Sequence, residues 1–110
     1  MLIYVVYYFE HYDDYKRAES FGDVLDVFTN EESAYALAVN CFIAMFKENN
    51  LTDFDDYDIL VNKTNILYKT LTFKEKYVMI KDKLYDKILP PPDYTMQPTH
   101  QNYCVKEFDV

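Results

Sequence analysis

The chain has 110 residues, which suffice for one hydrophobic core but not for two, so we expect a single domain over residues 1–110. Its content of 50% hydrophobic and 18% aromatic residues excludes an intrinsically disordered chain. The net charge of −8 is uneven, because residues 1–60 hold 13 acidic and 3 basic residues whereas residues 61–110 hold 6 and 8. Such an acidic half disfavours direct nucleic-acid binding and favours a protein partner with a basic surface.

Residues 2–9 are β-branched or aromatic almost throughout, which predicts a strand. Both alternating faces are apolar, as in a central strand that is covered on both sides. One helix covers only one face, so the other face needs a second helix, a loop or another subunit. The stretch is too short to span a membrane and lacks the basic start of a secretory signal, so we expect an intracellular protein that does not enter membranes.

Residues 11–22 are polar and predict a long solvated loop or a frayed hairpin. Residues 24–28 form the second expected strand. Because consecutive strands usually lie side by side, we expect the two strands to pair as a hairpin.

The longest apolar helix is expected over residues 33–46. Thr29 and Glu32 have the spacing of a capping box, in which each side chain bonds the backbone N–H of the other residue. Asn49 and Asn50 mark its end, because asparagine tolerates the left-handed conformation. Apolar residues cover most of the circumference, which predicts contact with two layers at once. These residues are Ala34, Tyr35, Leu37, Ala38, Val39, Cys41, Phe42, Met45 and Phe46.

The remaining elements are less uniform. A second helix is expected from Thr52 or Asp53 to about Thr70, although residues 59–61 and 66–68 would also suit strands. A third helix starts at a capping box of Thr72 and Glu75 and runs to residue 88, where three prolines end it. Residues 90–101 are expected as a polyproline-like connector, and residues 102–110 as the last strand. The predicted fold is therefore α+β, with a small, mainly antiparallel sheet packed on helices in the order β-β-α-α-α-β.

Four aspartates at positions 53, 55, 56 and 58 invite a calcium-site interpretation. An EF-hand loop that begins at Asp53 requires glycine at its sixth position and glutamate at its twelfth. The chain has Asp58 and Thr64 there, so we interpret the aspartates as the solvated start of a helix.

Other chemistry has little support in the sequence. His11, Asp13 and Asp14 are too sparse a set to indicate a zinc site over a surface loop, even if His100 joins them in space. Cys41 and Cys104 have no evident base nearby, and a chain with one glycine has no phosphate-binding loop. We therefore predict no catalytic residues, no cofactor, no metal and no enzymatic activity.

The acidic, tyrosine-containing surface is the predicted partner-binding site. Carboxylates interleaved with aromatic rings imitate a phosphate-and-base surface and suit a basic groove, whereas the alternative is that they serve solubility alone. A second alternative uses the doubly apolar first strand to build a homo-oligomer. The predicted partner-binding residues are Asp13, Asp14, Tyr15, Asp53, Asp55, Asp56 and Asp58.

Residues 4–8, 27–34 and 103–108 together resemble small orphan accessory proteins of phages and large DNA viruses. The resemblance implies a viral product located in the host cytoplasm or in the virion. The leading hypothesis is a non-enzymatic acidic protein that binds and occludes a host partner, such as a nucleic-acid-handling protein. The alternatives are a structural or assembly component of a virion and a metal-dependent hydrolase that uses His11, Asp13 and Asp14.

Overall fold

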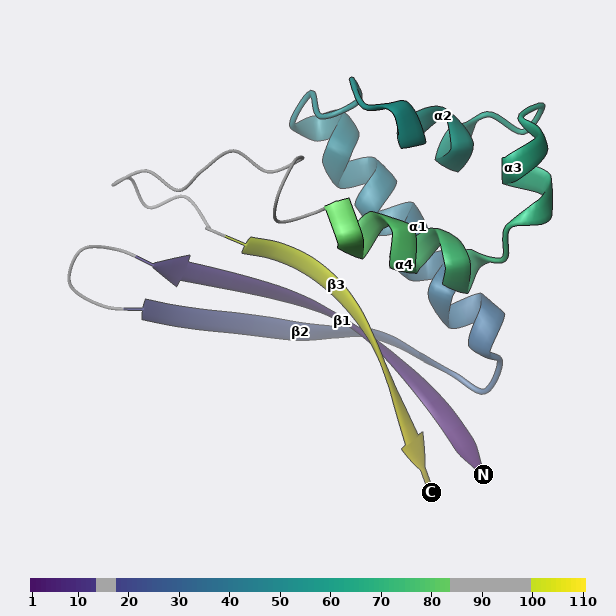
Figure 1. The fold of residues 1–110 in the computed structure, drawn as a ribbon. Coiled ribbons are helices and arrows are strands. Elements are labelled where there is room, and N and C mark those ends of the chain that lie inside the picture. Colours follow the sequence, from purple (N-terminus) through teal and green to yellow (C-terminus); the bar gives the residue numbers. More distant parts are fainter. Residues whose placement is uncertain (14–17, 84–99) are drawn as a thin grey trace.

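The computed structural model describes residues 1–13, 18–83 and 100–110 (Figure 1). Their fold is α+β, with a three-stranded antiparallel sheet and helices in the predicted order, which confirms the predicted class. Within that order, two short helices replace the second predicted helix. The elements are β1 (Leu2–Asp13), β2 (Ala18–Phe28), α1 (Glu31–Glu48), α2 (Asp55–Val61), α3 (Ile66–Thr70), α4 (Phe73–Lys83) and β3 (His100–Asp109).

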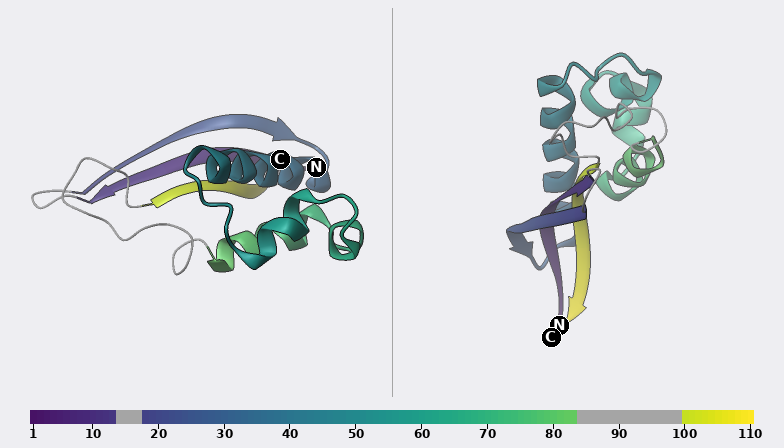
Figure 2. Two further views of the ribbon diagram at one scale, coloured as in Figure 1. Left: turned by 90° about the horizontal axis from the view of Figure 1, so that it is seen from above. Right: turned by 90° about the vertical axis from the view of Figure 1, so that its left-hand side faces the viewer.

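The sheet has the order β2-β1-β3, so β1 is the central strand that its sequence predicts. Tyr4 and Val6 on one face of β1 are buried against α1, while the alternate residues point to the opposite face. The β1–β2 hairpin is longer than predicted, since β1 continues to Asp13, and it extends beyond the helices (Figure 2). The predicted hairpin is therefore confirmed, and much of the polar stretch belongs to its strands.

Helix α1 begins one residue later than the predicted cap implies. Asn30 has an extended backbone, and its side-chain oxygen accepts a hydrogen bond from the Ser33 N–H at 3.0 Å. The predicted capping box of Thr29 and Glu32 is therefore wrong, because Asn30 takes the capping position. The end of the helix is as predicted, with Asn49 as the cap and Asn50 at a φ of 55°.

This correction predicts a difference between two adjacent alanine substitutions. Asn30→Ala leaves the Ser33 N–H without its partner and lowers the free energy of unfolding by about 1 kcal/mol. Thr29→Ala removes an exposed side chain outside the cap and changes it by less than about 0.5 kcal/mol. Urea denaturation of both variants measures the difference. A larger loss of stability in Thr29→Ala than in Asn30→Ala would show that Thr29 caps the helix.

Glu32 has another role, at the start of α4. Its carboxylate accepts hydrogen bonds from the backbone N–H groups of Phe73 at 3.2 Å and Lys74 at 3.4 Å. The capping box of Thr72 and Glu75 is confirmed, with both reciprocal bonds at 3.1 Å. The first turns of α1 and α4 are thus tied together.

The second predicted helix is interrupted between α2 and α3. The Asn62 side chain accepts a hydrogen bond from the Thr64 N–H, and the Asn65 side chain caps α3 at the Leu67 N–H. Short polar side chains that bond nearby backbone groups compete with the helical hydrogen bonds. The helical interpretation of this region is right, but the Asn62–Asn65 turn divides it.

The core consists of two adjoining clusters, both built on α1. One cluster lies between α1, α2 and α4, and the other between α1 and the sheet, so α1 contacts two layers as predicted. Phe42 lies where the clusters meet, with its ring 5.2 Å from Tyr103 on β3 and 6.2 Å from Tyr77 on α4. The buried core residues are Tyr4, Val6, Ala34, Ala38, Val39, Phe42, Met45, Phe46, Leu60 and Ile80.

Lys76 on α4 is the one charged residue that is buried among the residues described, with 3% of its surface exposed. Its Nζ lies 3.7 Å from the ring centroid of Tyr68 and 4.7 Å from that of Phe73. Burial lowers the pKa of the Lys76 ammonium, and the nearby Glu32 carboxylate opposes this shift. Two aromatic rings therefore stabilise a cation that has lost much of its hydration.

Because desolvating this charge is unfavourable, we expect Lys76→Met to leave the free energy of unfolding at pH 7 unchanged or to raise it by about 1 kcal/mol. The folded-state pKa of Lys76 is lowered, so between the folded and unfolded pKa values the unfolded chain binds the extra proton. Wild-type stability then rises with pH through that window, and the advantage of the methionine variant shrinks. Urea denaturation from neutral to alkaline pH tests this, with the exposed Lys69→Met as control. A large loss of stability in Lys76→Met would contradict the interpretation.

The rest of the predicted third helix and most of the predicted connector fall in residues 84–99, outside the described residues. The last strand is confirmed as β3, which begins two residues earlier than expected, at His100.

Candidate functional site

The aspartates around α2 have different environments. Asp53 and Asp55 are exposed and have no polar partner among the residues described. Asp56 forms an ion pair with Lys83 at 3.5 Å. Asp58 accepts hydrogen bonds from the side chains of Asn62 at 3.2 Å and Asn65 at 2.8 Å, so it stabilises the turn between α2 and α3.

The other predicted partner-binding residues are at the end of the β1–β2 hairpin. Asp13 is the last residue of β1, whereas Asp14 and Tyr15 lie outside the described residues. This end of the hairpin is well separated from the start of α2 (Figure 1). The predicted acidic surface therefore does not form one patch within the described part of the chain.

The sheet register places His11 of β1 directly opposite His100 of β3. The backbones of the two histidines considered for a metal site are therefore paired on neighbouring strands. Among the described side chains, no group of three or more His, Cys, Asp or Glu residues is arranged to hold a metal ion.

The most distinctive surface is the side of the sheet that faces away from α1, which we call the outer sheet face. The alternation along the three paired strands defines it. Val24, Val27 and Phe108 on this face are 65%, 50% and 42% exposed. Its members are Ile3, Val5, Tyr7, Phe9, Val24, Val27, Cys104, Lys106 and Phe108.

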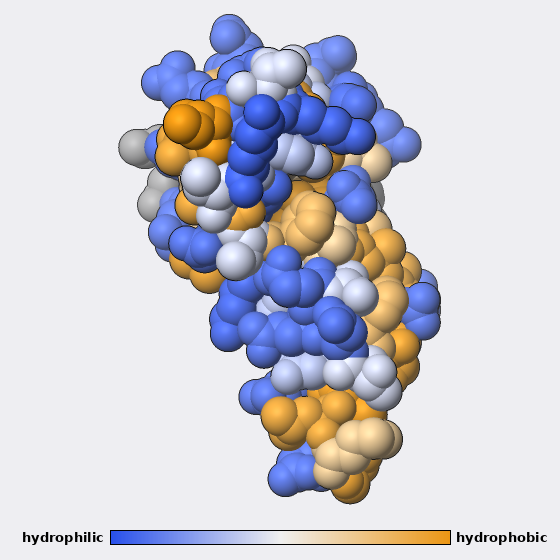
Figure 3. Space-filling model, turned by 90° about the vertical axis from the view of Figure 1, so that its right-hand side faces the viewer, coloured by the Kyte–Doolittle hydropathy of each residue, from blue (hydrophilic) through white to orange (hydrophobic). Residues whose placement is uncertain are grey.

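Most of the outer sheet face is open because the described helices pack on the other side of the sheet, although the Lys81 side chain of α4 reaches Cys104 at its margin. The sheet-side cluster of the core joins α1 to the opposite faces of the strands (Figures 1 and 2). The apolar surface continues to the end of the molecule that holds both termini, where Met1, Leu2 and Val110 are exposed (Figure 3). A monomer seldom exposes an extended apolar surface without using it to bind a partner.

The two edges of the sheet are less available than this face. On β3, the Val105 backbone forms a hydrogen bond with the Tyr77 side chain of α4, so a helix covers part of that edge. On β2, the pairing with β1 shifts between Val6 and Tyr7, which leaves Leu25 as an extra bulged residue. Asp26 also accepts a hydrogen bond from the adjacent Val27 N–H at 2.8 Å. A bulge and charged side chains both discourage pairing with another strand.

Burial raises the pKa of the Tyr77 hydroxyl, and the nearby Cys104 adds to this shift. We expect Tyr77→Phe to lower the free energy of unfolding at pH 7 by about 1–2 kcal/mol, because the Val105 backbone loses its partner. Since the folded-state pKa is raised, the hydroxyl stabilises the folded state fully below pH 10, and this contribution is lost as the pH rises further. Urea denaturation at increasing pH should therefore show the difference between wild type and Tyr77→Phe narrowing above pH 10, and a constant difference would contradict this assignment.

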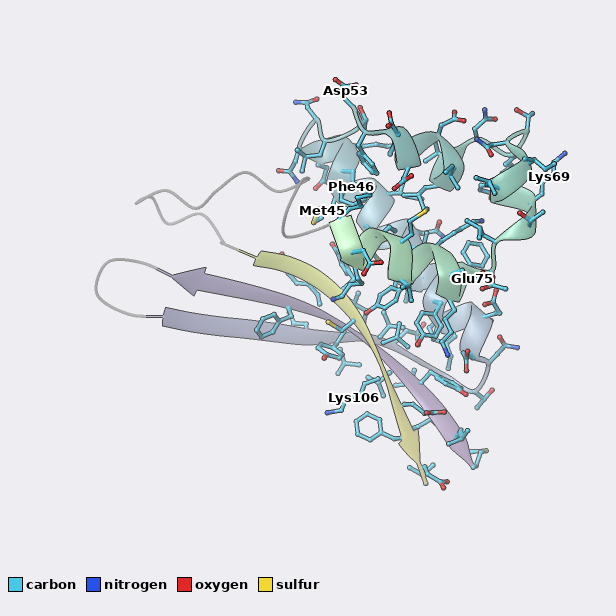
Figure 4. The ribbon with its side chains drawn as sticks, in the orientation of Figure 1. Met45, Phe46, Asp53, Lys69, Glu75 and Lys106 are labelled. Atoms are coloured by element: carbon cyan, nitrogen blue, oxygen red, sulfur yellow. The ribbon has the colours of Figure 1, made fainter. Side chains whose placement is uncertain are left out.

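The two faces of the sheet differ in charge. Lys106 is the only charged member of the outer sheet face, points away from the helices, and lies with its Nζ 5.5 Å from the ring centroid of Phe108 (Figure 4). The exposed carboxylates of the edge strands lie on the opposite face of the sheet, because the register pairs Asp23 with Tyr8, Asp26 with Val6, Glu107 with Tyr4 and Asp109 with Leu2. The outer sheet face is thus an apolar surface that carries Lys106, while these carboxylates project from the other side of the sheet.

In the sequence, this surface was indicated by residues 2–9, which are apolar on both faces of the predicted strand. A single helix covers only one of these faces, so the other needs a second helix, a loop or a partner. The exposure of Val24 and Val27 was missed, because an apolar strand beside an apolar helix suggests burial. The alternation of Cys104, Lys106 and Phe108 along β3 is a further signal, since it places one charge on an otherwise apolar face.

Comparisons with protein-family models, with curated proteins and with solved structures found no match. Within the described residues, no helix has the length and apolar character needed to cross a membrane.

Proposed function

We propose that this chain is a non-enzymatic, acidic protein-binding protein whose partner docks on the outer sheet face. The observation that carries the proposal is the exposure of Val24, Val27 and Phe108 on a sheet face that no described helix covers. Burying these side chains on a partner is favourable by roughly 25 cal/mol for each Å² of apolar surface removed from water.

The covered and irregular edges favour docking on the face over the addition of a strand. A partner strand on β3 would meet Tyr77 and Lys81 of α4. A partner strand on β2 would meet the bulge at Leu25 and the Asp26 side chain. Both contacts interrupt the regular backbone pairing that strand addition needs.

The charges favour a different protein over a second copy of this chain. Two copies in contact through their outer sheet faces would bring together chains that each carry a net charge of −8. Like net charges disfavour such a complex, whereas a partner of positive net charge would be attracted to this chain. The expected partner therefore presents an apolar patch and has a basic surface.

We extend the proposal to the viral setting that the sequence resemblance implies. A small acidic protein that covers an apolar patch on a basic host protein would block access of that protein to its own ligand. A nucleic acid is one such ligand, because basic surfaces commonly bind it. A virion assembly role is the competing proposal, and it requires that the chain bind copies of itself.

The test is capture of a partner by the tagged chain, in the cells that naturally produce it, at salt concentrations from about 0.05 M to about 0.5 M. We expect a specific partner whose capture weakens as salt rises, and a monomer in light scattering of the isolated chain. Val24→Asp should abolish capture, whereas aspartate at the exposed Ile66 of α3 should not. A stable oligomer with no salt-sensitive partner would overturn the proposal in favour of self-assembly.

A further inference from the structure

The outer sheet face is made of rows of side chains that run across the strands. The register gives the rows as Ile3 with Phe108, Val5 with Val27 and Lys106, Tyr7 with Val24 and Cys104, and Phe9 with Gly22. These four rows, each two residues from the next, span about 20 Å along the strands, and the two edge strands lie about 10 Å apart. A helix of about 13 residues has this length, and with its side chains it is about 10–12 Å wide. The face therefore has the dimensions of one helix.

The inner face of the same sheet shows how a helix packs on it. There, Ala34 and Ala38 of α1 pack against Val6 of β1. On the outer sheet face, Val5 and Tyr7 of the same strand are only half-buried, because no described helix lies over them (Figure 2). A sheet with a helix on each face is one of the stable layered arrangements of protein folds. A helix from a partner would complete this arrangement.

The charge on the outer sheet face indicates what that helix carries. Lys106 has no ion-pair partner among the described residues, since the exposed carboxylates of the two edge strands lie on the other face. The ring of Phe108, 5.5 Å from the Lys106 Nζ, keeps the ammonium over the apolar surface. Burying this ammonium without a counter-charge would weaken docking. A complementary helix therefore places a carboxylate opposite Lys106.

We propose that the partner docks an amphipathic helix on the outer sheet face, and that a carboxylate within the apolar side of this helix pairs with Lys106. The inference rests on the proposed function and names the partner element that the face accepts. Lys106 then determines specificity, because a helix with lysine or arginine at the same position places like charges in contact. The net charge of −8 acts over a longer distance and attracts a partner that is basic elsewhere on its surface.

The test selects binders from a displayed library of helical peptides of about 14 residues, with one side of the helix randomised. The full wild-type chain is the bait, and peptides that also bind Val24→Asp are removed because they bind elsewhere. We expect the selected peptides to carry an apolar side with aspartate or glutamate at one position. Selection on Lys106→Glu should give lysine or arginine at that position. The exposed Lys69→Glu of α3 is the matched control and should select the same acidic peptides as wild type.

The affinities of a selected peptide and its charge-reversed version measure the pairing. The acidic peptide with wild type, and the basic peptide with Lys106→Glu, should each bind at least about tenfold tighter than the two mismatched pairs. Selected peptides without an acidic preference, or equal affinities for all pairs, would overturn the role of Lys106. A second library with a central proline, which breaks the helix, should yield no binders to this face. Equally good binders from the proline library, or no binders from the helical one, would overturn the helical partner.

These selections use no natural partner, so their outcome is separate from that of partner capture. Capture that Val24→Asp abolishes, together with no acidic preference among the peptides, would uphold the proposed function and overturn this inference. Capture that is indifferent to Val24→Asp would overturn the proposed function, whatever the peptides show.

Discussion

Replacing Phe42 by alanine lowers the free energy of unfolding by about 3–5 kcal/mol, the largest stability effect we expect from a single side chain. Phe42 is fully buried on α1, and its ring is stacked 6.1 Å from Phe46. It also contacts Tyr77 and Tyr103, which pack against both core clusters. The substitution therefore leaves a cavity where α4, α1 and the sheet meet.

Urea denaturation followed by circular dichroism measures this loss, and Leu67→Ala is the matched control. Leu67 on α3 is 45% exposed, so its truncation should cost less than about 1 kcal/mol. Losses of similar size in the two variants would contradict the assignment of Phe42 to the centre of the core.

Replacing Val27 by aspartate weakens binding of the partner by at least about 2 kcal/mol, or roughly 30-fold. The substitution places a carboxylate within the outer sheet face, where docking would bury it without a matching charge. Val27 is 50% exposed in the isolated chain, so Val27→Asp should lower the stability of the folded chain only slightly. The affinity is measured by titration calorimetry with the captured partner.

Ile66→Asp is the control for added negative charge, because Ile66 is 74% exposed on α3 and is not part of the outer sheet face. It changes the net charge of the chain by the same amount. An equal loss of affinity in both variants would show that total charge governs binding. That result would favour the acidic surface around Asp53 and Asp55 over the sheet.

Much of the fold was predictable because its signals are local. The alternation of residues 2–9 predicted a central strand, and the apolar circumference of α1 predicted contact with two layers. The Thr72–Glu75 capping box marked the start of α4 correctly. At α1 the same rule failed, because Asn30 follows Thr29 and is an equally good capping residue.

The features that the sequence did not predict depend on contacts between distant residues. Lys76 is one of several lysines on α4, and only the positions of Tyr68 and Phe73 show that it is buried between aromatic rings. Likewise, nothing local joins Lys81 to Cys104. The openness of the outer sheet face depends on where every helix packs, which residues 2–9 alone could not reveal.

The acidic aspartates illustrate a similar limit. Their spacing suggested one surface, yet Asp56 pairs with Lys83 and Asp58 bonds two asparagines. Composition therefore identified the sign of the charge, while the structure separates the exposed carboxylates from those that stabilise the fold.

The most direct test of the central claim is carbene footprinting of the chain alone and in its complex. If the partner docks on the outer sheet face, labelling of Val24, Val27 and Phe108 should fall sharply in the complex, while Ile66 and Asp53 remain labelled as in the free chain. Protection of Asp53 and Asp55, with Val24, Val27 and Phe108 unchanged, would contradict the account.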